Sequence, residues 1–168
     1  MKFTSASANK QIKILEDRKN YLLQRESNNS TYILADDEKG EVPDYDFEAC
    51  NSEIDALDRK IRTLKHAINV FNSTTVLPLG ITIDRALVEM AQLNNKLPRL
   101  DMMRKAMNKR RLSGVMAGRR DVAEYEYLNY DPDQAEKVYE ADFERVQQIQ
   151  LALDKVNQTV EFEVDLDE

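Results

Sequence analysis

The sequence predicts a mainly α fold: an antiparallel helical hairpin or four-helix bundle with a local coiled-coil seam and a small β-ribbon. Apolar residues recur at steps of three and four over long stretches, which is the spacing of one helix face. Only four glycines and four prolines interrupt the 168 residues. A segment near the end of the chain alternates apolar and acidic residues, which is the period of a strand. We expect residues 1–168 to form one helical domain.

The segment 46–71 is expected to be a helix and carries the most regular apolar pattern. Its steps alternate three and four through Phe47, Cys50, Ile54, Leu57, Ile61, Leu64, Ile68 and Phe71. The other faces carry charged residues, which suit water. We therefore expect a helix seam, made of Ile54, Leu57, Ile61, Leu64 and Ile68, to pack against another helix.

Three further helices are expected, over about 5–25, 83–111 and 132–157. The last begins at Asp131 and Pro132, since aspartate is a favoured cap and proline suits the first helical position. Pro98 falls inside the third helix, where it removes one backbone hydrogen bond. We expect a kink there, with a full break into two helices as the alternative.

Segments 31–34, 123–129 and 159–165 have strand character. The last of them has one apolar and one acidic face, so it is expected to be half-buried. Because an isolated two-stranded ribbon is marginal in water, this tail strand needs support. We expect it to pair antiparallel with Tyr125–Tyr127. The ribbon so formed must then lie on the helices, pair with the Tyr32 segment, or pair with another subunit.

The charge distribution is uneven. The chain has a net charge of -7, yet residues 96–120 contain nine basic residues and one acidic residue. Residues 121–168 contain fifteen acidic and three basic residues. In one interpretation, the basic segment pairs with the acidic final helix and tail, within one subunit or across a dimer.

In the other interpretation, the basic segment is an exposed patch that binds nucleic acid, another polyanion or a protein partner. The contact residues would be Lys105, Lys109, Arg110, Arg111, Arg119 and Arg120. The nearby tyrosines, at positions 125, 127 and 130, are suited to stacking on bases.

Residue types that support catalysis or metal binding are scarce. Cys50 is the single cysteine and lies on the apolar seam, so we expect a small buried hydrophobe in a protein from a reducing compartment. His66 is the single histidine, which excludes a multi-histidine metal site within one chain. Thr63 stands three positions before it, so the Glu-x-x-His pair of di-metal bundles is missing. We expect no catalytic residue, no metal and no cofactor.

No stretch approaches the roughly 20 apolar residues that cross a bilayer, and the first residues lack the apolar core of a signal peptide. We therefore expect a cytoplasmic protein that does not act on a membrane.

Four segments resemble a known family. They are Met1–Phe3 at the start, Ile68–Asn72 at the end of the second helix, Gly80–Leu87 opening the third, and Asn157–Val160. The chain resembles a group of small, mostly helical bacterial proteins without an established function, some of which are labelled septicolysin. The resemblance implies a helical hairpin architecture. The label suggests a lytic toxin, whereas the sequence shows no membrane-active segment.

These observations favour a non-enzymatic structural or interaction protein that acts through helix–helix and β-ribbon contacts. The seam and the strand-like segments need partners, so we expect a homo-oligomer, with a dimer favoured, and a further protein partner of unknown identity. The alternative function is polyanion or nucleic-acid binding by residues 96–120.

Overall fold

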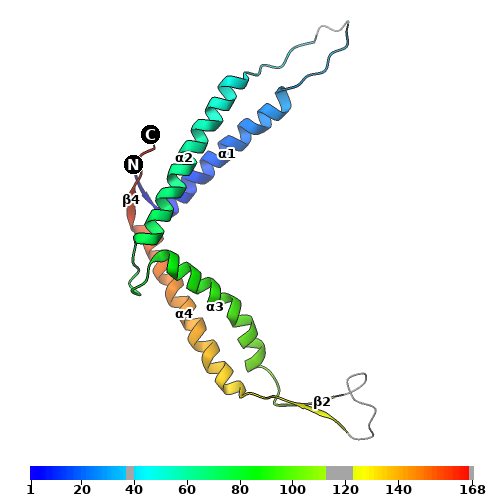
Figure 1. Cartoon of the computed structure of the whole chain (residues 1–168), viewed down its shortest axis with the longest axis vertical. Coiled ribbons are helices and arrows are strands. Elements are labelled where there is room, and N and C mark those ends of the chain that lie inside the picture. The colour runs from blue at the N-terminus through cyan, green and yellow to red at the C-terminus, as the bar shows by residue number, and fades with distance from the viewer. Residues whose placement is uncertain (37–39, 113–122, 167–168) are drawn as a thin grey trace. The chain divides into compact units, whose positions relative to one another are not determined.

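The computed structural model describes residues 1–36, 40–112 and 123–166, and within them the chain forms four helices and four short strands (Figure 1). In chain order these are β1 (Lys2–Thr4), α1 (Ser5–Asn29), α2 (Phe47–Thr74), α3 (Ile83–Arg104), β2 (Lys109–Arg111), β3 (Tyr125–Tyr127), α4 (Pro132–Thr159) and β4 (Glu161–Glu163). The strands form two antiparallel sheets of two strands each. The predicted mainly helical class with a small β-ribbon is confirmed.

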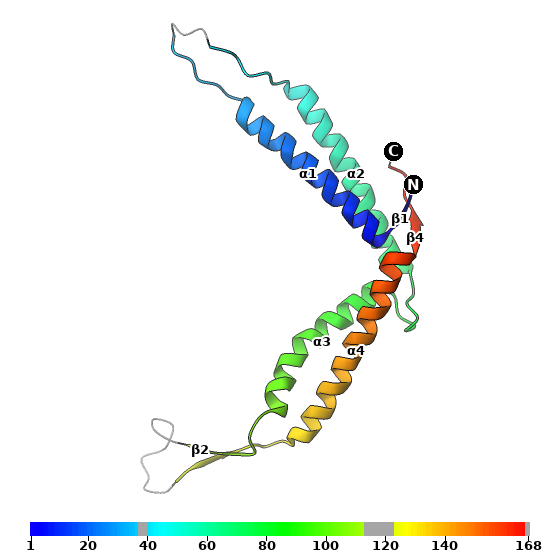
Figure 2. The ribbon, with the colours of Figure 1, turned by 180° about the vertical axis from the view of Figure 1, so that it is seen from behind.

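The chain divides into two compact units. Unit 1 contains Met1–Thr75 and Asp154–Glu168, and unit 2 contains Val76–Leu153. Each unit holds one antiparallel helix pair, α1 with α2 in unit 1 and α3 with most of α4 in unit 2 (Figure 2). We describe each unit by itself, and the single domain expected over residues 1–168 stays a prediction.

The predicted seam on α2 packs against α1 of the same chain. Its residues Ile61, Leu64 and Ile68 are buried, and the other two seam residues are half-buried. The three buried seam residues form one core with Ala8 and Ile12 of α1. Burial of such apolar side chains is the main force that holds two amphipathic helices together. The coiled-coil geometry expected for the seam stays a prediction.

Ion pairs between α1 and α2 flank this core, and they are consistent with a single register of the two helices. Arg18 contacts Glu53 at 2.8 Å, Lys19 contacts Asp58 at 2.7 Å and Lys65 contacts Glu16 at 2.8 Å. Glu53 and Asp58, nearer the start of α2, pair with Arg18 and Lys19, whereas Lys65, further along α2, pairs with the earlier Glu16 of α1, as in an antiparallel pair. These pairs are largely exposed, so each adds little stability.

The tail strand does not pair as predicted. β4 pairs with β1, with Phe162 opposite Phe3, and the Val164 N–H donates to the Met1 carbonyl at 2.8 Å. The ring of Phe162 lies 4.8 Å from the ring of Phe71 on α2, and Val164 is part of the unit 1 core. This support from α1 and α2 makes a two-stranded sheet stable. β1 was missed because three residues show no periodicity.

In unit 2, α3 runs without a break through Pro98. Pro98 and Asn94, whose carbonyl loses its helical partner, are both exposed, so the missing hydrogen bond lies on the solvent-facing side of the helix. A tight turn precedes the helix, and Gly80 takes a φ of 76° there, a conformation that favours glycine. Among the described residues of unit 2, the buried ones are Leu77, Ile83, Ala86, Leu100, Ala135, Ile149 and Leu153.

Two expected elements are wrong. Residues 31–34 are not a strand among the described residues, and the Ile33 side chain is 97% exposed, since no neighbouring strand pairs with this segment. The third helix ends at Arg104 rather than 111, because residues 109–111 form β2 and pair with β3. Lysine and arginine are good helix formers, but the tertiary pairing overrides that preference.

Within residues 1–36, 40–112 and 123–166, no helix combines the length and the apolar character needed to span a bilayer.

Candidate partner-binding surfaces

The basic segment predicted from sequence is divided between α3 and the β2–β3 ribbon. Among the predicted contact residues, Lys105 pairs with Asp101 at 2.7 Å and Arg110 pairs with Glu126 at 2.9 Å. Arg111 forms no ion pair with any residue in the described part of the chain. Arg119 and Arg120 lie outside the described residues. The structure therefore brings Lys109, Arg110 and Arg111 together on one strand.

The ribbon has two chemically different faces. Residues opposite each other in an antiparallel pair share a face, and successive residues alternate. Lys109 lies opposite Tyr127 and Arg111 opposite Tyr125, so these four residues share one face, named here the basic–aromatic face. The Lys109 ammonium lies 4.1 Å from the centre of the Tyr125 ring and 5.3 Å from that of Tyr127.

On the opposite face of the ribbon, Arg110 faces Glu126 and is neutralised by it. The basic–aromatic face holds two cations and no carboxylate among its four residues. A sequence reading that treats the three basic residues alike cannot make this distinction, because it depends on the register.

Backbone hydrogen bonds extend the ribbon beyond its strands. The Leu112 N–H donates to the Glu124 carbonyl at 2.9 Å, and the Leu128 N–H donates to the Asn108 carbonyl at 3.2 Å. The Tyr130 hydroxyl donates to the Met103 carbonyl at 3.1 Å, which attaches the base of the ribbon to the end of α3. These hydrogen bonds hold in place the backbone that carries the four side chains of the basic–aromatic face.

Ion pairs between α3 and α4 confirm, for part of the basic segment, the interpretation that it pairs with the acidic final helix. Lys96 contacts Asp142 at 2.7 Å, and Arg104 contacts Glu136 at 2.8 Å while lying over the Tyr139 ring. Asp142 is a half-buried acidic residue of α4. Its ion pair with Lys96 accounts for a charged side chain at that position.

Hydrogen bonds from cations shift the pKa of two carboxyl groups in unit 2. Arg145 holds the pKa of Glu89 below its ordinary value, and the two groups lie 2.6 Å apart. Lys105, followed by Arg104, lowers the pKa of Asp101. Each carboxylate is stabilised in its charged form by a cation. Such pairs are structural and leave these groups ionised near neutral pH.

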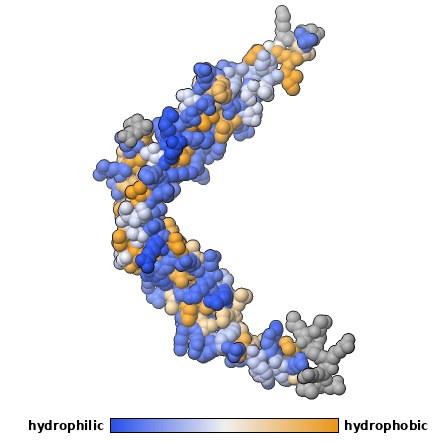
Figure 3. Space-filling model, in the orientation of Figure 1, coloured by the Kyte–Doolittle hydropathy of each residue, from blue (hydrophilic) through white to orange (hydrophobic). Residues whose placement is uncertain are grey.

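One side of α3 carries no charge and has no partner among the described residues of its unit. Between the first and last turns of the helix, seven exposed and uncharged residues cover about a third of its circumference. This α3 face consists of Leu87, Val88, Ala91, Asn94, Asn95, Pro98 and Met102. Apolar residues reach the surface of both units among a mostly hydrophilic exterior (Figure 3). An uncharged face is unusual in a chain of which 33% of residues are charged.

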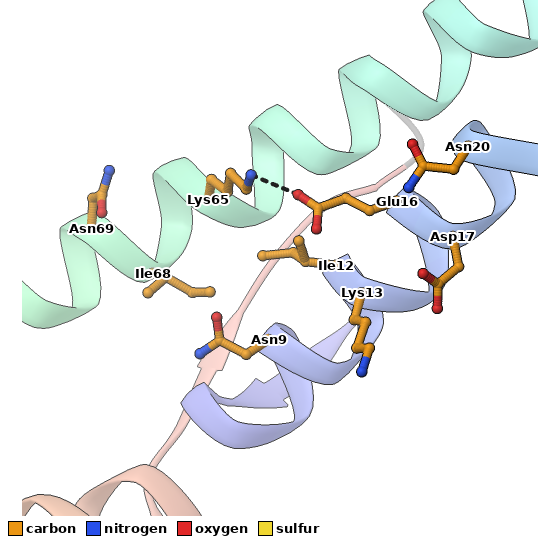
Figure 4. Close-up of a pocket in the computed structure, with 9 residues that line it drawn as sticks. All are labelled: Asn9, Ile12, Lys13, Glu16, Asp17, Asn20, Lys65, Ile68 and Asn69. Carbon is orange, nitrogen blue, oxygen red and sulfur yellow. Dashed lines mark hydrogen bonds and ion pairs between the residues drawn. The ribbon is translucent and has the colours of Figure 1, made fainter. Parts of the chain in front are cut away.

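A groove of about 650 Å³ lies between α1 and α2 (Figure 4). Ile12 and Ile68 contribute its apolar part, and the Lys65–Glu16 ion pair crosses it. The remaining lining residues are Asn9, Lys13, Asp17, Asn20 and Asn69. Apart from these two isoleucines, the lining side chains are polar and mostly exposed, so the groove offers no buried polar group to orient a ligand.

The residues weighed for chemistry lie apart. His66 is exposed on α2, whereas Cys50, expected to be buried, is half-buried. Among the described residues, no three side chains of histidine, cysteine, aspartate or glutamate converge in a way that would hold a metal ion.

No family model matches the chain, and no curated protein matches it. Among solved structures, it is similar to a functionally unknown conserved protein from Corynebacterium diphtheriae, with a TM-score of 0.61 and 17% sequence identity. The match covers 97% of this chain and 100% of that chain. At this identity the likeness shows the fold alone, and the resemblance to the septicolysin-labelled family stays a prediction. The mainly helical fold of this chain is therefore one that also occurs in a bacterial protein of unknown function.

Proposed function

We propose that this chain is a non-enzymatic interaction protein that forms a homodimer through the helices of unit 2. The uncharged, exposed α3 face carries the proposal. The centre of a protein–protein interface is depleted of charged residues, whereas ordinary exposed helix surface is rich in them. Leu87 and Met102 are exposed at the two ends of this face. A partner that covered it would remove their apolar surface from water.

The charges of the two units favour unit 2 as the place where two copies meet. Unit 2 contains twelve basic and twelve acidic residues, so its net charge is zero. Unit 1 contains twelve basic and nineteen acidic residues, which gives it the whole net charge of -7. Two copies that meet through unit 2 avoid the repulsion that two acidic surfaces create.

The features that suggested a dimer from sequence no longer support one. The α2 seam is covered by α1, and the tail strand pairs with β1 of the same chain. The proposal therefore depends on the exposed α3 face, which the sequence analysis did not single out. The identity of a further protein partner and the cytoplasmic location stay predictions.

The proposed homodimer is tested by sedimentation velocity over a concentration series from about 1 to 100 μM. We expect the mass to rise toward twice the 19.5 kDa of the chain. A single 19.5 kDa species across the series would contradict the homodimer.

The basic–aromatic face favours polyanion binding as a second candidate function. Lys109, which lies over the tyrosine rings, and Arg111 form no ion pair with a described residue and can contact phosphates, and Tyr127 is exposed enough to stack on a base. We expect the protein to be retained on heparin at low salt and released as salt rises, because polyanion binding releases counterions.

Substitution at the ribbon discriminates this binding from general charge attraction. Arg111→Gln is expected to lower the salt concentration of elution, while Arg110→Gln on the opposite face changes it less. Both variants remove one positive charge from neighbouring positions of the same strand. Equal effects, or elution that salt does not change, would rule out a site on the basic–aromatic face.

A further inference from the structure

We propose that two copies pair through the α3 face about a two-fold axis, with the helices antiparallel and their centre between Asn94 and Asn95. This inference rests on the proposed homodimer and adds its surface, orientation and register. In a two-fold contact the same surface is used by both subunits, so each residue must suit the residue that the symmetry places opposite it.

The side chains of the α3 face are complementary in this register. Residues equally far from the centre come together, so Leu87 of one copy meets Met102 of the other and Ala91 meets Pro98. Crossing helices approach most closely at the crossing point and diverge away from it. Small residues near the centre permit the close approach, and the two large apolar residues fill the wider space at the ends.

The charges at the ends of α3 select the antiparallel orientation. The same register places Asp84, in the first turn, opposite Lys105, which follows the last turn and also pairs with Asp101 of its own chain. Both side chains are exposed, and hydrogen bonds from Thr82 and the Arg85 N–H lower the pKa of Asp84, so it remains charged. A parallel pair would instead bring like charges together at both ends, which is unfavourable.

The centre of the α3 face is polar but uncharged. Asn94 and Asn95 each carry a donor and an acceptor, so two copies can exchange hydrogen bonds between them across the axis. A single polar residue in an otherwise apolar helix contact fixes the register, since a shifted pairing leaves its groups without partners. The two asparagines therefore specify which residues meet.

Two variants test the surface. Ala91→Glu introduces a charge near the centre of the α3 face and is expected to weaken dimerisation at least about 100-fold, because the charge is buried without a partner. Gln92→Glu adds the same charge at the neighbouring exposed position off the face, and we expect it to leave the dissociation constant unchanged. Far-UV circular dichroism shows whether both variants keep the helical content.

Spin labels test the orientation. In a Cys50→Ser background, the single substitutions Gln92→Cys, Arg99→Cys and Arg85→Cys provide attachment points for spin labels. All three positions are exposed and lie off the α3 face. An antiparallel pair gives offsets along the helix axis between equivalent residues of about 8, 14 and 29 Å respectively, at 1.5 Å per residue. The distances measured by double electron–electron resonance should therefore increase in that order. A parallel pair gives nearly equal distances.

The outcomes separate this inference from the function on which it rests. A dimer that Ala91→Glu leaves intact, or labels with equal distances, would overturn the α3 pairing while the homodimer stands. A wild-type chain that stays monomeric would overturn both.

Discussion

Leu64→Ala is expected to lower the free energy of unfolding of unit 1 by about 3 kcal/mol. The Leu64 side chain is 0% exposed and lies in the core that α1, α2 and the β1–β4 sheet share. Alanine removes apolar contacts and leaves a cavity that a helix pair can only partly close. Urea unfolding followed by circular dichroism at 222 nm measures the loss as a lower midpoint.

Val70→Ala is the matched control on the same helix. The Val70 side chain is 46% exposed, so the substitution should change the free energy of unfolding by less than about 1 kcal/mol. If the two variants unfold at the same urea concentration, the seam is not the core of unit 1 and the packing described for α2 is wrong.

Ile149→Ala is expected to cost unit 2 about 3 kcal/mol. Ile149 is 0% exposed and lies on α4, in the stretch whose ion pairs attach it to α3. Because one helix pair forms this unit, few other side chains compensate for the loss. Hydrogen exchange read by mass spectrometry should show faster exchange of the α3 and α4 amides, since their opening then requires less free energy.

Leu151→Ala, two residues further along α4, provides the comparison. Leu151 is 70% exposed, and its removal should leave the exchange of α3 unchanged. Faster exchange throughout α1 and α2 in the Ile149 variant would mean that the two units do not open separately.

The helices could be predicted because their signals are local. The α2 seam follows directly from the spacing of its apolar residues, and Asp131 with Pro132 marks the start of α4. Each signal depends on residues one or two turns apart, which the sequence shows directly. The pairing of β1 with β4 could not be predicted, because the two strands are far apart in the sequence and β1, with three residues, is too short to show a period.

The candidate surfaces were partly visible in the sequence. The excess of charge located the basic segment, but only the register of β2 and β3 shows that Arg110 is neutralised while Arg111 is not. The α3 face has a signal of its own, the lack of charge between Leu87 and Met102 at helical spacing. This face was not recognised because uncharged residues at helical spacing ordinarily indicate a buried helix face.

The pairing of β1 with β4 has a consequence for synthesis of the chain on the ribosome. Lys2 and Glu163 are register partners, so the sheet of unit 1 cannot form until residue 163 has been made. Unit 2 is one continuous stretch, Val76–Leu153, and its helices can close earlier. Until β4 emerges, Phe3 lacks its sheet partner, and its apolar side chain is left without the cover of Phe162.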